Sequence, residues 1–454
     1  MPTHDNQPIH GQWSSRLAFI MAATGSAVGL GNIWKFPYIT GENGGSAFVF
    51  VYLLCVAALG IPLMMTEVML GRRGKRTPVN TMRDLAAEAN AHQGWQIIGW
   101  SGTIAAVLIL SYYSVIGGWT IGYILHAATG DFSGLSGDGA SNLFGDFVGN
   151  PLVQVGWHTA FMFITIWIVA RGVRHGLEKA VTYLMPVLVA LLLVLVGYAM
   201  TTGYFMKGIA FLFTPDFSHF SGASMLTALG HAFFTLSLGM GSIMIYGSYV
   251  PKDTSIASTS VAVAIADTLV ALVAGMAIFP IVFANDLAPG AGPSLIFETL
   301  PVAFGHMPGG TFFGTLFFVL LLIAAWTSAI SLVEPTVTML IEKFNMTRRQ
   351  AAFRTGFATW LLGFGAAFSF NLWSDATILG MTVFDHLDFL TSNLMLPLGA
   401  IGMALFAGWV MSKHMSREEL NMNSETGYLI WQVSTRVIAP IAVSIVLLHA
   451  IGLF

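Results

Sequence analysis

An apolar segment over residues 14–37 combines features that a membrane helix does not normally tolerate. Gly25, Gly29 and Gly31 interrupt it at mid-depth, and Asn32 and Lys35 follow directly. A helix in a bilayer has no water to satisfy freed N–H and C=O groups, so such backbone survives only where it lines a cavity or binds something. A broken helix at the midplane offers amide donors to an anion and carbonyl acceptors to a cation. The segment therefore predicts a site for a zwitterion together with a metal ion.

A second apolar segment, residues 221–249, carries a similar interruption at Gly239-Met240-Gly241. The two interrupted segments take matching positions in two sets of five spans, residues 14–204 and 221–411, with 428–452 left as an additional span. Paired interruptions of this kind indicate an inverted-repeat secondary transporter. The alternative is that the glycines only let neighbouring helices pack closely, as small residues do in membranes.

Polar side chains inside other spans predict where a cation would bind. A dehydrated monovalent cation wants about five or six oxygens from carbonyls, hydroxyls and amides, with at most one carboxylate. Asn32, Thr235 and Asp267 can supply one such set. Thr327 and Ser328, with carbonyls freed near Gly25, can supply a second. The alternative for the Thr327-Ser328 pair is back-bonding of the hydroxyls to the carbonyl one helical turn earlier.

Three further polar side chains lie at membrane depth. Glu67 ends the apolar part of the second span and Glu334 precedes Pro335 in the eighth. A charge at this depth costs about 2.5–3.5 kcal/mol on insertion scales, so we expect a partner for each. His231, one turn before Thr235, is interpreted as a packing histidine.

The composition of the whole chain fits a polytopic membrane protein. Of its 454 residues 55% are hydrophobic and 9% are charged, and the mean hydropathy is +0.74. A soluble domain carries charge on nearly a quarter of its residues. The net charge of -3 and the lack of basic-aromatic stripes argue against nucleic acid as a partner. Cys55 is the single cysteine, which excludes an intrachain disulfide.

Apolar runs of spanning length recur eleven times. We predict an all-α protein with membrane helices near residues 14–37, 44–71, 95–127, 152–170, 177–204, 221–249, 254–284, 310–342, 349–370, 386–411 and 428–452. Basic residues concentrate in alternate loops, after spans two, four, six, eight and ten, whereas the opposite loops hold only Lys35 and Lys207. By the positive-inside rule the N-terminus is cytoplasmic and Phe454 is outside. No cleavable signal peptide is expected.

Motifs for enzymatic chemistry are missing from the sequence. There is no P-loop, and no HExxH, CxxC or GxSxG in a suitable context. The sequence therefore lacks the residues needed for nucleotide-driven transport and for intramembrane zinc proteolysis, and we do not expect an enzyme.

Several motifs resemble the neurotransmitter:sodium symporter family, above all its bacterial branch of eleven-span hydrophobic amino acid transporters. They are Trp13-Ser-Ser-Arg16, Gly25-Ser-Ala-Val-Gly-Leu-Gly-Asn-Ile-Trp-Lys-Phe-Pro37, Glu42-Asn-Gly-Gly45, Gly60-Ile-Pro-Leu63, Phe233-Phe-Thr-Leu-Ser-Leu-Gly-Met-Gly241 and Ala325-Trp-Thr-Ser328. The resemblance covers nearly the whole chain. It implies the inverted-repeat (5+5), leucine transporter-like fold of a single transmembrane domain, with helices 1 and 6 unwound at mid-membrane.

The resemblance also implies the binding residues, position by position. Those matching substrate-binding positions are Ala27, Leu30, Gly31, Ile109, Tyr113, Phe234, Thr235, Ser237, Met240, Ser328 and Leu332. Those matching the first sodium site are Ala27, Asn32, Thr235 and Asp267, and those matching the second are Gly25, Val28, Ala324, Thr327 and Ser328. Eukaryotic members need chloride near the first sodium. Because Asp267 already supplies a fixed negative charge there, chloride is expected to be dispensable.

The positions that match the family's gates hold, in part, other residue types than most relatives have. The outer gate resembles Lys35 with Asp388, where most relatives have arginine at the first position. Lysine lacks the bidentate fork of arginine, so we expect a looser gate. At the inner gate Glu342 fits the family's acid, but the arginine position reads His10. The alternative is that Trp13 and Tyr249 close the inside unaided.

The function implied is sodium-coupled import of hydrophobic or aromatic L-amino acids by alternating access, in a bacterial inner membrane, by a monomer or weak dimer. Members that carry decarboxylated monoamines have an aspartate where this chain has Gly29, so the substrate is expected to bring its own carboxylate. Two rivals remain. One is the same fold carrying an imino acid, betaine or another osmolyte, and the other is an amino acid sensor or a channel that does not perform coupled transport.

Overall fold

The computed structural model describes residues 13–218, 220–289 and 295–453, and the described chain is built almost entirely of helices. The eleven predicted spans each correspond to helical structure. In chain order these are α1 (Arg16–Ala27) with η1 (Gly31–Lys35) and α2 (Phe36–Glu42); α3 (Ser46–Cys55) with η2 (Val56–Gly60) and α4 (Ile61–Gly74); α6 (Gln96–Thr129); α8 (Pro151–Ala170); η4 (Val173–Glu178) with α9 (Lys179–Met200); α11 (Gly222–Thr235) and α12 (Ser242–Ser248); α13 (Ile256–Ala284); α15 (Gly310–Phe344); α16 (Arg348–Phe368); α17 (Val383–Asp388) with η6 (Phe389–Met395), α18 (Leu396–Leu405) and η7 (Phe406–Val410); and α20 (Glu425–Val433) with η8 (Ser434–Ile438) and α21 (Ala439–Ala450).

Length and composition alone mark eight helices of the described chain as able to cross a membrane, and nine if the bent pair at residues 16–42 is one span. Two predicted spans fall outside this criterion for physical reasons. The sixth is divided into α11 and α12, which are too short separately. The ninth, α16, begins with Arg348 and Arg349 and also carries Arg354, which lowers its hydropathy.

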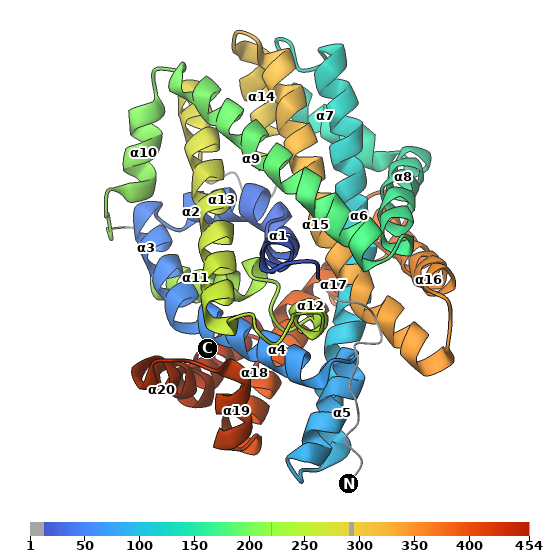
Figure 1. Cartoon of the computed structure of the whole chain (residues 1–454). Coiled ribbons are helices and arrows are strands. Elements are labelled where there is room, and N and C mark those ends of the chain that lie inside the picture. Colours follow the sequence, from blue (N-terminus) through green and yellow to red (C-terminus); the bar gives the residue numbers. More distant parts are fainter. Residues whose placement is uncertain (1–12, 219, 290–294, 454) are drawn as a thin grey trace.

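Short helices that the hydropathy pattern does not reveal connect the spans. They are α5 (Pro78–Glu88), η3 (Gln93–Trp95), α7 (Gly137–Gly149), α10 (Phe205–Phe213), α14 (Thr299–His306) and α19 (Lys413–Leu420). In Figure 1, α7 and α14 lie at the end of the molecule opposite α5 and α19. For α5 a local signal was present, because Thr77 caps its N-terminus and Pro78 takes the first helical position, where the missing N–H costs nothing.

The interrupted helices lie in the middle of the molecule. Figure 1 shows α1 and α12 surrounded by α4, α13 and α15, and α1 packs against α13, α15, α9 and α12. Close backbone contact makes this centre compact. A Cβ on Gly71 of α4 would lie 1.9 Å from the carbonyl oxygen of Met244 in α12. Only glycine permits the two helices to cross at this distance. The proposed repeat of residues 14–204 and 221–411 stays a prediction.

Candidate functional site

The first interruption lies where the sequence predicted it. Helix α1 ends at Ala27, Val28 turns to an extended conformation (ψ 108°), and a π-helical turn starts at Gly31. The two parts are bent by 52°. Two side chains fasten the freed backbone: the amide oxygen of Asn32 accepts from the Gly29 N–H (3.0 Å), and the Tyr113 hydroxyl accepts from the Leu30 N–H (3.3 Å). The break is therefore ordered, and its N–H groups donate to side chains instead of to helix carbonyls.

The second interruption separates α11 from α12 over residues 236–241. Ser237, Gly239 and Gly241 all have positive φ (54°, 87° and 75°), a region that L side chains avoid. The buried Glu67 carboxylate on α4 accepts hydrogen bonds from the Gly239 and Met244 N–H groups, at 3.2 and 3.3 Å. Glu67 thus holds the unwound segment in place. The sequence showed a carboxylate at membrane depth that needed a partner, but it did not show that the partner was backbone.

The predicted first cation set is assembled around Asp267. The amide nitrogen of Asn32 donates to Asp267 Oδ1 (2.8 Å), to the Asp267 carbonyl (3.0 Å) and to Thr235 Oγ1 (3.2 Å). The Thr235 hydroxyl donates to Asp267 Oδ2 (3.0 Å). All three side chains are buried. The Asn32 nitrogen faces the carboxylate and its oxygen faces Gly29, so a cation beside Asp267 would need this amide to turn.

The predicted second cation set lies between α1 and α15. The Thr327 hydroxyl is 3.3 Å from the Val28 carbonyl and 3.0 Å from that of Ala324. The Ser328 hydroxyl is 3.2 Å from the Val28 carbonyl. Gly25 faces the same place, since a Cβ there would be 3.4 Å from Thr327 Cβ. The structure therefore brings together all five predicted residues, and the Thr327–Ala324 bond also has the back-bonding geometry that the sequence left as an alternative.

A cavity of about 40 Å³ lies between the two interruptions. Its lining contains all eleven residues predicted for the substrate: Ala27, Leu30, Gly31, Ile109, Tyr113, Phe234, Thr235, Ser237, Met240, Ser328 and Leu332. Ser26, Gly29 and Ser331 also line it, and the Ser26 and Ser331 hydroxyls are 2.8 Å apart. Neither serine was predicted. A serine in an apolar helix often bonds to a carbonyl of its own helix, so its presence in the sequence does not indicate a binding site.

The lining of this cavity contains both polar and apolar groups. The Ser26 carbonyl accepts from the hydroxyls of Ser237 (2.9 Å) and Ser328 (3.2 Å). The side chains of Ile109, Met240 and Leu332 supply the apolar part. At Gly29 a Cβ would lie 2.3 Å from Ser328 Oγ and 3.0 Å from the Tyr113 hydroxyl oxygen, so a side chain there would require these two hydroxyls to move.

The predicted outer gate pair is not joined in this structure. Lys35 Nζ lies over the Phe234 ring, 4.4 Å from its centroid, a cation–π contact. Asp388 accepts instead from the hydroxyls of Tyr112 (3.0 Å) and Ser392 (2.9 Å), and among the described residues no ion pair links it to Lys35. In this structure hydroxyls on α6 and η6 satisfy the carboxylate and an aromatic face satisfies the ammonium, and the gate role of the two residues stays a prediction.

Phe234 separates two spaces. It lines the inner cavity and also a larger one of about 250 Å³, which Lys35, His231, Ser392 and His449 line as well. The ring with Lys35 above it is thus the partition between the two. Lys35 and Phe234 come from the two interrupted spans, so a movement of either span would change this partition.

At the opposite end of the site, Trp13 is buried against α12. Its indole Nε1–H donates to the Tyr246 carbonyl (3.1 Å), and its ring meets those of Tyr246 and Tyr249 edge-on at 5.2 and 5.8 Å. The Tyr249 hydroxyl donates to the buried carboxylate of Glu334 (2.8 Å). Arg348, at the start of α16, binds that carboxylate with both nitrogens, at 2.9 and 2.6 Å. The partner expected for Glu334 is thus an arginine 14 residues farther along the chain.

Glu342, the predicted acid of the inner gate, contacts the start of α5. Its carboxylate accepts from the backbone N–H of Thr77 (3.0 Å), the Thr77 hydroxyl (3.2 Å) and the Asn80 amide, and Arg76 Nε lies 3.5 Å away. It therefore fastens the start of α5 to the end of α15. His10, its predicted partner, lies outside the described residues.

Comparisons with known proteins agree with this architecture. The family model described as "Sodium:neurotransmitter symporter family" matches residues 10–136 and 148–454. An uncharacterized sodium-dependent transporter of Bacillus subtilis, YhdH, is 39% identical over 99% of both chains. A sodium-dependent transporter of Haemophilus influenzae is 35% identical over 96% of both chains. The crystal structure of MhsT in complex with L-phenylalanine superposes with a TM-score of 0.89, at 44% identity, covering 97% of this chain and all of that one.

These matches span nearly the whole sequence and include a solved structure with the same helical architecture. The predicted leucine transporter-like fold is confirmed, and so is the prediction that the chain is not an enzyme. The chain belongs to the sodium:neurotransmitter symporter family and is a multi-pass, sodium-dependent membrane transporter.

Proposed function

We propose that this transporter imports hydrophobic or aromatic L-amino acids together with two sodium ions by alternating access. The observation that carries the proposal is the cavity between two unwound helices, lined both by residues of the two interruptions and by the apolar side chains of Ile109, Met240 and Leu332. The binding of phenylalanine by MhsT supports the substrate class. The basic loops favour a cytoplasmic N-terminus in a bacterial inner membrane.

The substrate carboxylate is assigned to the Leu30–Tyr113 pair. The bond between them is long, at 3.3 Å, so an arriving carboxylate can accept from both the Leu30 N–H and the Tyr113 hydroxyl in its place. The N-terminal end of the helical turn at Gly31 adds a favourable dipole. The ammonium is assigned to carbonyls around Ala27 and Phe234 and to the Ser237 hydroxyl. A substrate without a carboxylate would leave the Leu30 N–H on the Tyr113 hydroxyl and gain no hydrogen bond from either group.

The cavity as a whole is small, because 40 Å³ holds only about three waters. A leucine or phenylalanine side chain therefore requires Met240 and Phe234 to move. Methionine has three rotatable bonds and adapts to several shapes. An apolar pocket of this kind discriminates weakly among neighbouring hydrophobic side chains, so we expect a broad substrate range.

Two sodium ions would supply enough free energy for accumulation. With a tenfold gradient and about 100 mV, two ions supply roughly 7 kcal/mol for a neutral zwitterion, or about five decades of concentration. The first ion is assigned to Asp267 with Asn32, Thr235 and the Ala27 carbonyl. The second is assigned to Gly25, Val28, Ala324, Thr327 and Ser328. Chloride is not required in this proposal, since Asp267 supplies the negative charge.

Uptake into proteoliposomes tests the proposal. Labelled phenylalanine should accumulate only with an inward sodium gradient, with or without chloride, and leucine and tryptophan should compete. Asp267→Ala should abolish this uptake, whereas Asp286→Ala, an exposed aspartate just beyond α13, should leave it unchanged. Competition by proline or betaine but not by leucine would favour the osmolyte alternative. Saturable binding without counterflow would favour a sensor, and wild-type uptake by Asp267→Ala would remove that residue from the sodium site.

A further inference from the structure

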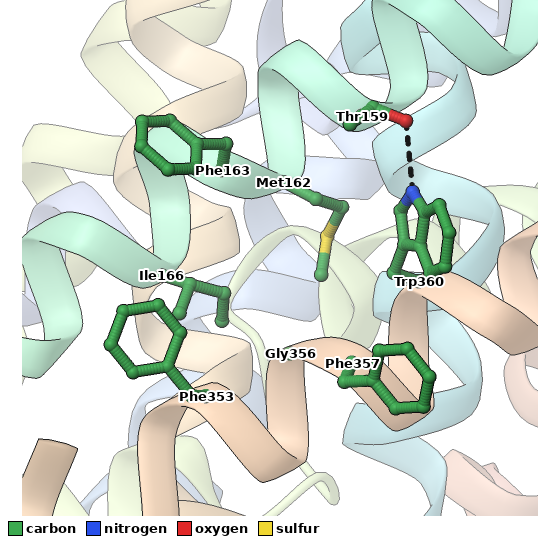
Figure 2. A pocket seen from close by; sticks show the side chains of 8 residues that line it. All are labelled: Thr159, Met162, Phe163, Ile166, Phe353, Gly356, Phe357 and Trp360. Carbon is green, nitrogen blue, oxygen red and sulfur yellow. Dashed lines mark hydrogen bonds between the residues drawn. The ribbon is translucent and has the colours of Figure 1, made fainter. Parts of the chain in front are cut away.

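A groove on the outer surface of the helix bundle lies between α8 and α16, far from the substrate cavity. It encloses about 200 Å³ and is lined by Thr159, Met162, Phe163, Ile166, Phe353, Gly356, Phe357 and Trp360. Figure 2 shows these side chains facing one another across the two helices. All except Thr159 and Gly356 are hydrophobic. The groove opens outward, because Phe163, Phe353 and Phe357 are 65%, 55% and 62% exposed.

Two hydrogen bonds fix the ends of this groove. The indole nitrogen of Trp360 donates to the Thr159 hydroxyl at one end (2.9 Å), which Figure 2 marks with a dashed line. At the other end Arg348 Nε donates to the Val169 carbonyl (2.8 Å). Seven residues of α8 separate Thr159 from Ile166, which corresponds to about 10 Å along the helix. The floor is Gly356, where a Cβ would lie 2.4 Å from Ile166. Glycine therefore sets the depth of the groove.

Positive charge collects at the Arg348 end only. Arg171 follows α8 directly and its guanidinium lies over the Trp167 ring, 3.6 Å from the centroid. Arg349 and Arg354 lie in the first two turns of α16, and both are exposed. Among the described residues none of these three arginines forms an ion pair with a carboxylate, whereas their neighbour Arg348 is paired with Glu334. None of the eight lining residues is charged, so these arginines lie beside the groove and not in its wall.

An apolar channel about 10 Å long with arginines at one end has the charge distribution of a phospholipid binding site. Both helices are predicted spans, so in this proposal the surface that the groove opens onto is hydrocarbon. The arginine end is the one that we propose to be cytoplasmic, where anionic headgroups attract basic side chains and basic pockets between membrane helices bind them. A guanidinium binds phosphate with two parallel hydrogen bonds.

We propose that the groove binds one anionic phospholipid, with an acyl chain between α8 and α16 and the phosphate at Arg171 and Arg349. This lipid site does not depend on which amino acid the protein transports. The packing of the chain against the aromatic side chains gives the site its shape, and the arginines give it preference for an anionic headgroup. Annular lipid on a smooth helical surface would show no such preference.

Native mass spectrometry with added lipid tests the proposal. The full-length protein should retain one phosphatidylglycerol at least fivefold more strongly than phosphatidylcholine of the same acyl chains. Arg171→Gln/Arg349→Gln should remove this preference. The matched control Lys252→Gln/Lys413→Gln removes two exposed charges from the loops after the sixth and tenth spans and should keep it. Met162→Phe should weaken retention by filling the groove while leaving the arginines in place.

Several outcomes would overturn the site. They are equal retention of the two lipids, equal loss in both double variants, full retention by Met162→Phe, and a dimer that forms through this face and excludes lipid. Sodium-driven amino acid uptake by each variant in proteoliposomes shows that it is folded. Because that readout does not depend on which lipid is retained, failure of the lipid site and failure of the transport proposal are distinguishable.

Discussion

Removal of the Trp13 side chain should open the inner side of the transporter. The indole is 2% exposed and fastens the start of α1 to α12. Trp13→Ala deletes the hydrogen bond to the Tyr246 carbonyl, worth about 1 kcal/mol. It also deletes two edge-on ring contacts, each worth about 0.5–1.5 kcal/mol. The inner-closed state should therefore lose about 2–4 kcal/mol relative to an inner-open state in which these contacts are already broken.

That loss converts to a measurable change in population. At about 1.4 kcal/mol per tenfold, 3 kcal/mol raises the open-to-closed ratio roughly a hundredfold. Ser242 is fully buried one turn beyond Gly239, and its hydroxyl donates to the Ser331 carbonyl (3.2 Å). A reporter introduced by Ser242→Cys, in a Cys55→Ala background, should react with a thiol reagent in proportion to the open population. Trp13→Ala should raise the labelling rate by about two orders of magnitude.

A matched tryptophan change controls for general loosening. Trp373 is 44% exposed, beyond the end of α16, and its ring meets that of Phe368 edge-on. Trp373→Ala removes an indole of the same size without touching α1 or α12, so it should leave the labelling rate unchanged. An unchanged rate in Trp13→Ala, or an equal increase in both variants, would refute the reasoning that Trp13 holds the inner side closed.

Three further changes test other contacts. Lys35→Arg should slow amino acid exchange in proteoliposomes without loss of binding, because a guanidinium can keep the contact with Phe234 and also reach for the Asp388 carboxylate; exchange at the wild-type rate would argue against a gate there. Arg348→Leu leaves the buried Glu334 carboxylate without its cation and should lower the free energy of unfolding by about 3–5 kcal/mol, measured as a lower melting temperature in detergent. Arg349→Leu, at the exposed neighbouring position, is the control. An equal shift of the melting temperature in both variants would show that the ion pair is unimportant. Gly71→Ala should prevent correct folding, measured as loss of monodisperse protein, because its Cβ would overlap the Met244 carbonyl; Gly156→Ala in α8, where no described atom lies within 4 Å, should be tolerated.

The spans and the interruptions could be predicted because they depend on local chemistry. An apolar run of about 20 residues has the length of a membrane-spanning helix, and a glycine cluster at mid-depth indicates where such a helix is interrupted. The six connecting helices α5, η3, α7, α10, α14 and α19 were not predicted because they are short, so a hydropathy pattern averaged over spanning length does not reveal them. All the substrate positions predicted from the family motifs line one cavity. The motifs could predict them because each motif residue corresponds to one position of the family's binding site.

Partners across the fold could not be predicted in the same way. The choice of Arg348 for Glu334, and of backbone N–H groups for Glu67, depends on how α15, α16, α4 and α12 pack. For Lys35 and Asp388 the sequence shows opposite charges but not the hydroxyls and rings that compete for them. Tyr112, Ser392 and Phe234 satisfy both groups separately.

Asn32 joins the proposed first sodium site to the proposed substrate site through one amide group. Its oxygen holds the Gly29 N–H and its nitrogen holds Asp267. An ion beside Asp267 needs the oxygen, so the amide must turn and release the Gly29 N–H, one residue before the Leu30 donor assigned to the carboxylate. Binding of the ion and the shape of the broken segment are therefore linked, and linkage is reciprocal: a substrate that favours the released segment also favours the ion. Coupling in this proposal thus needs no long pathway, because a single buried side chain touches both sites.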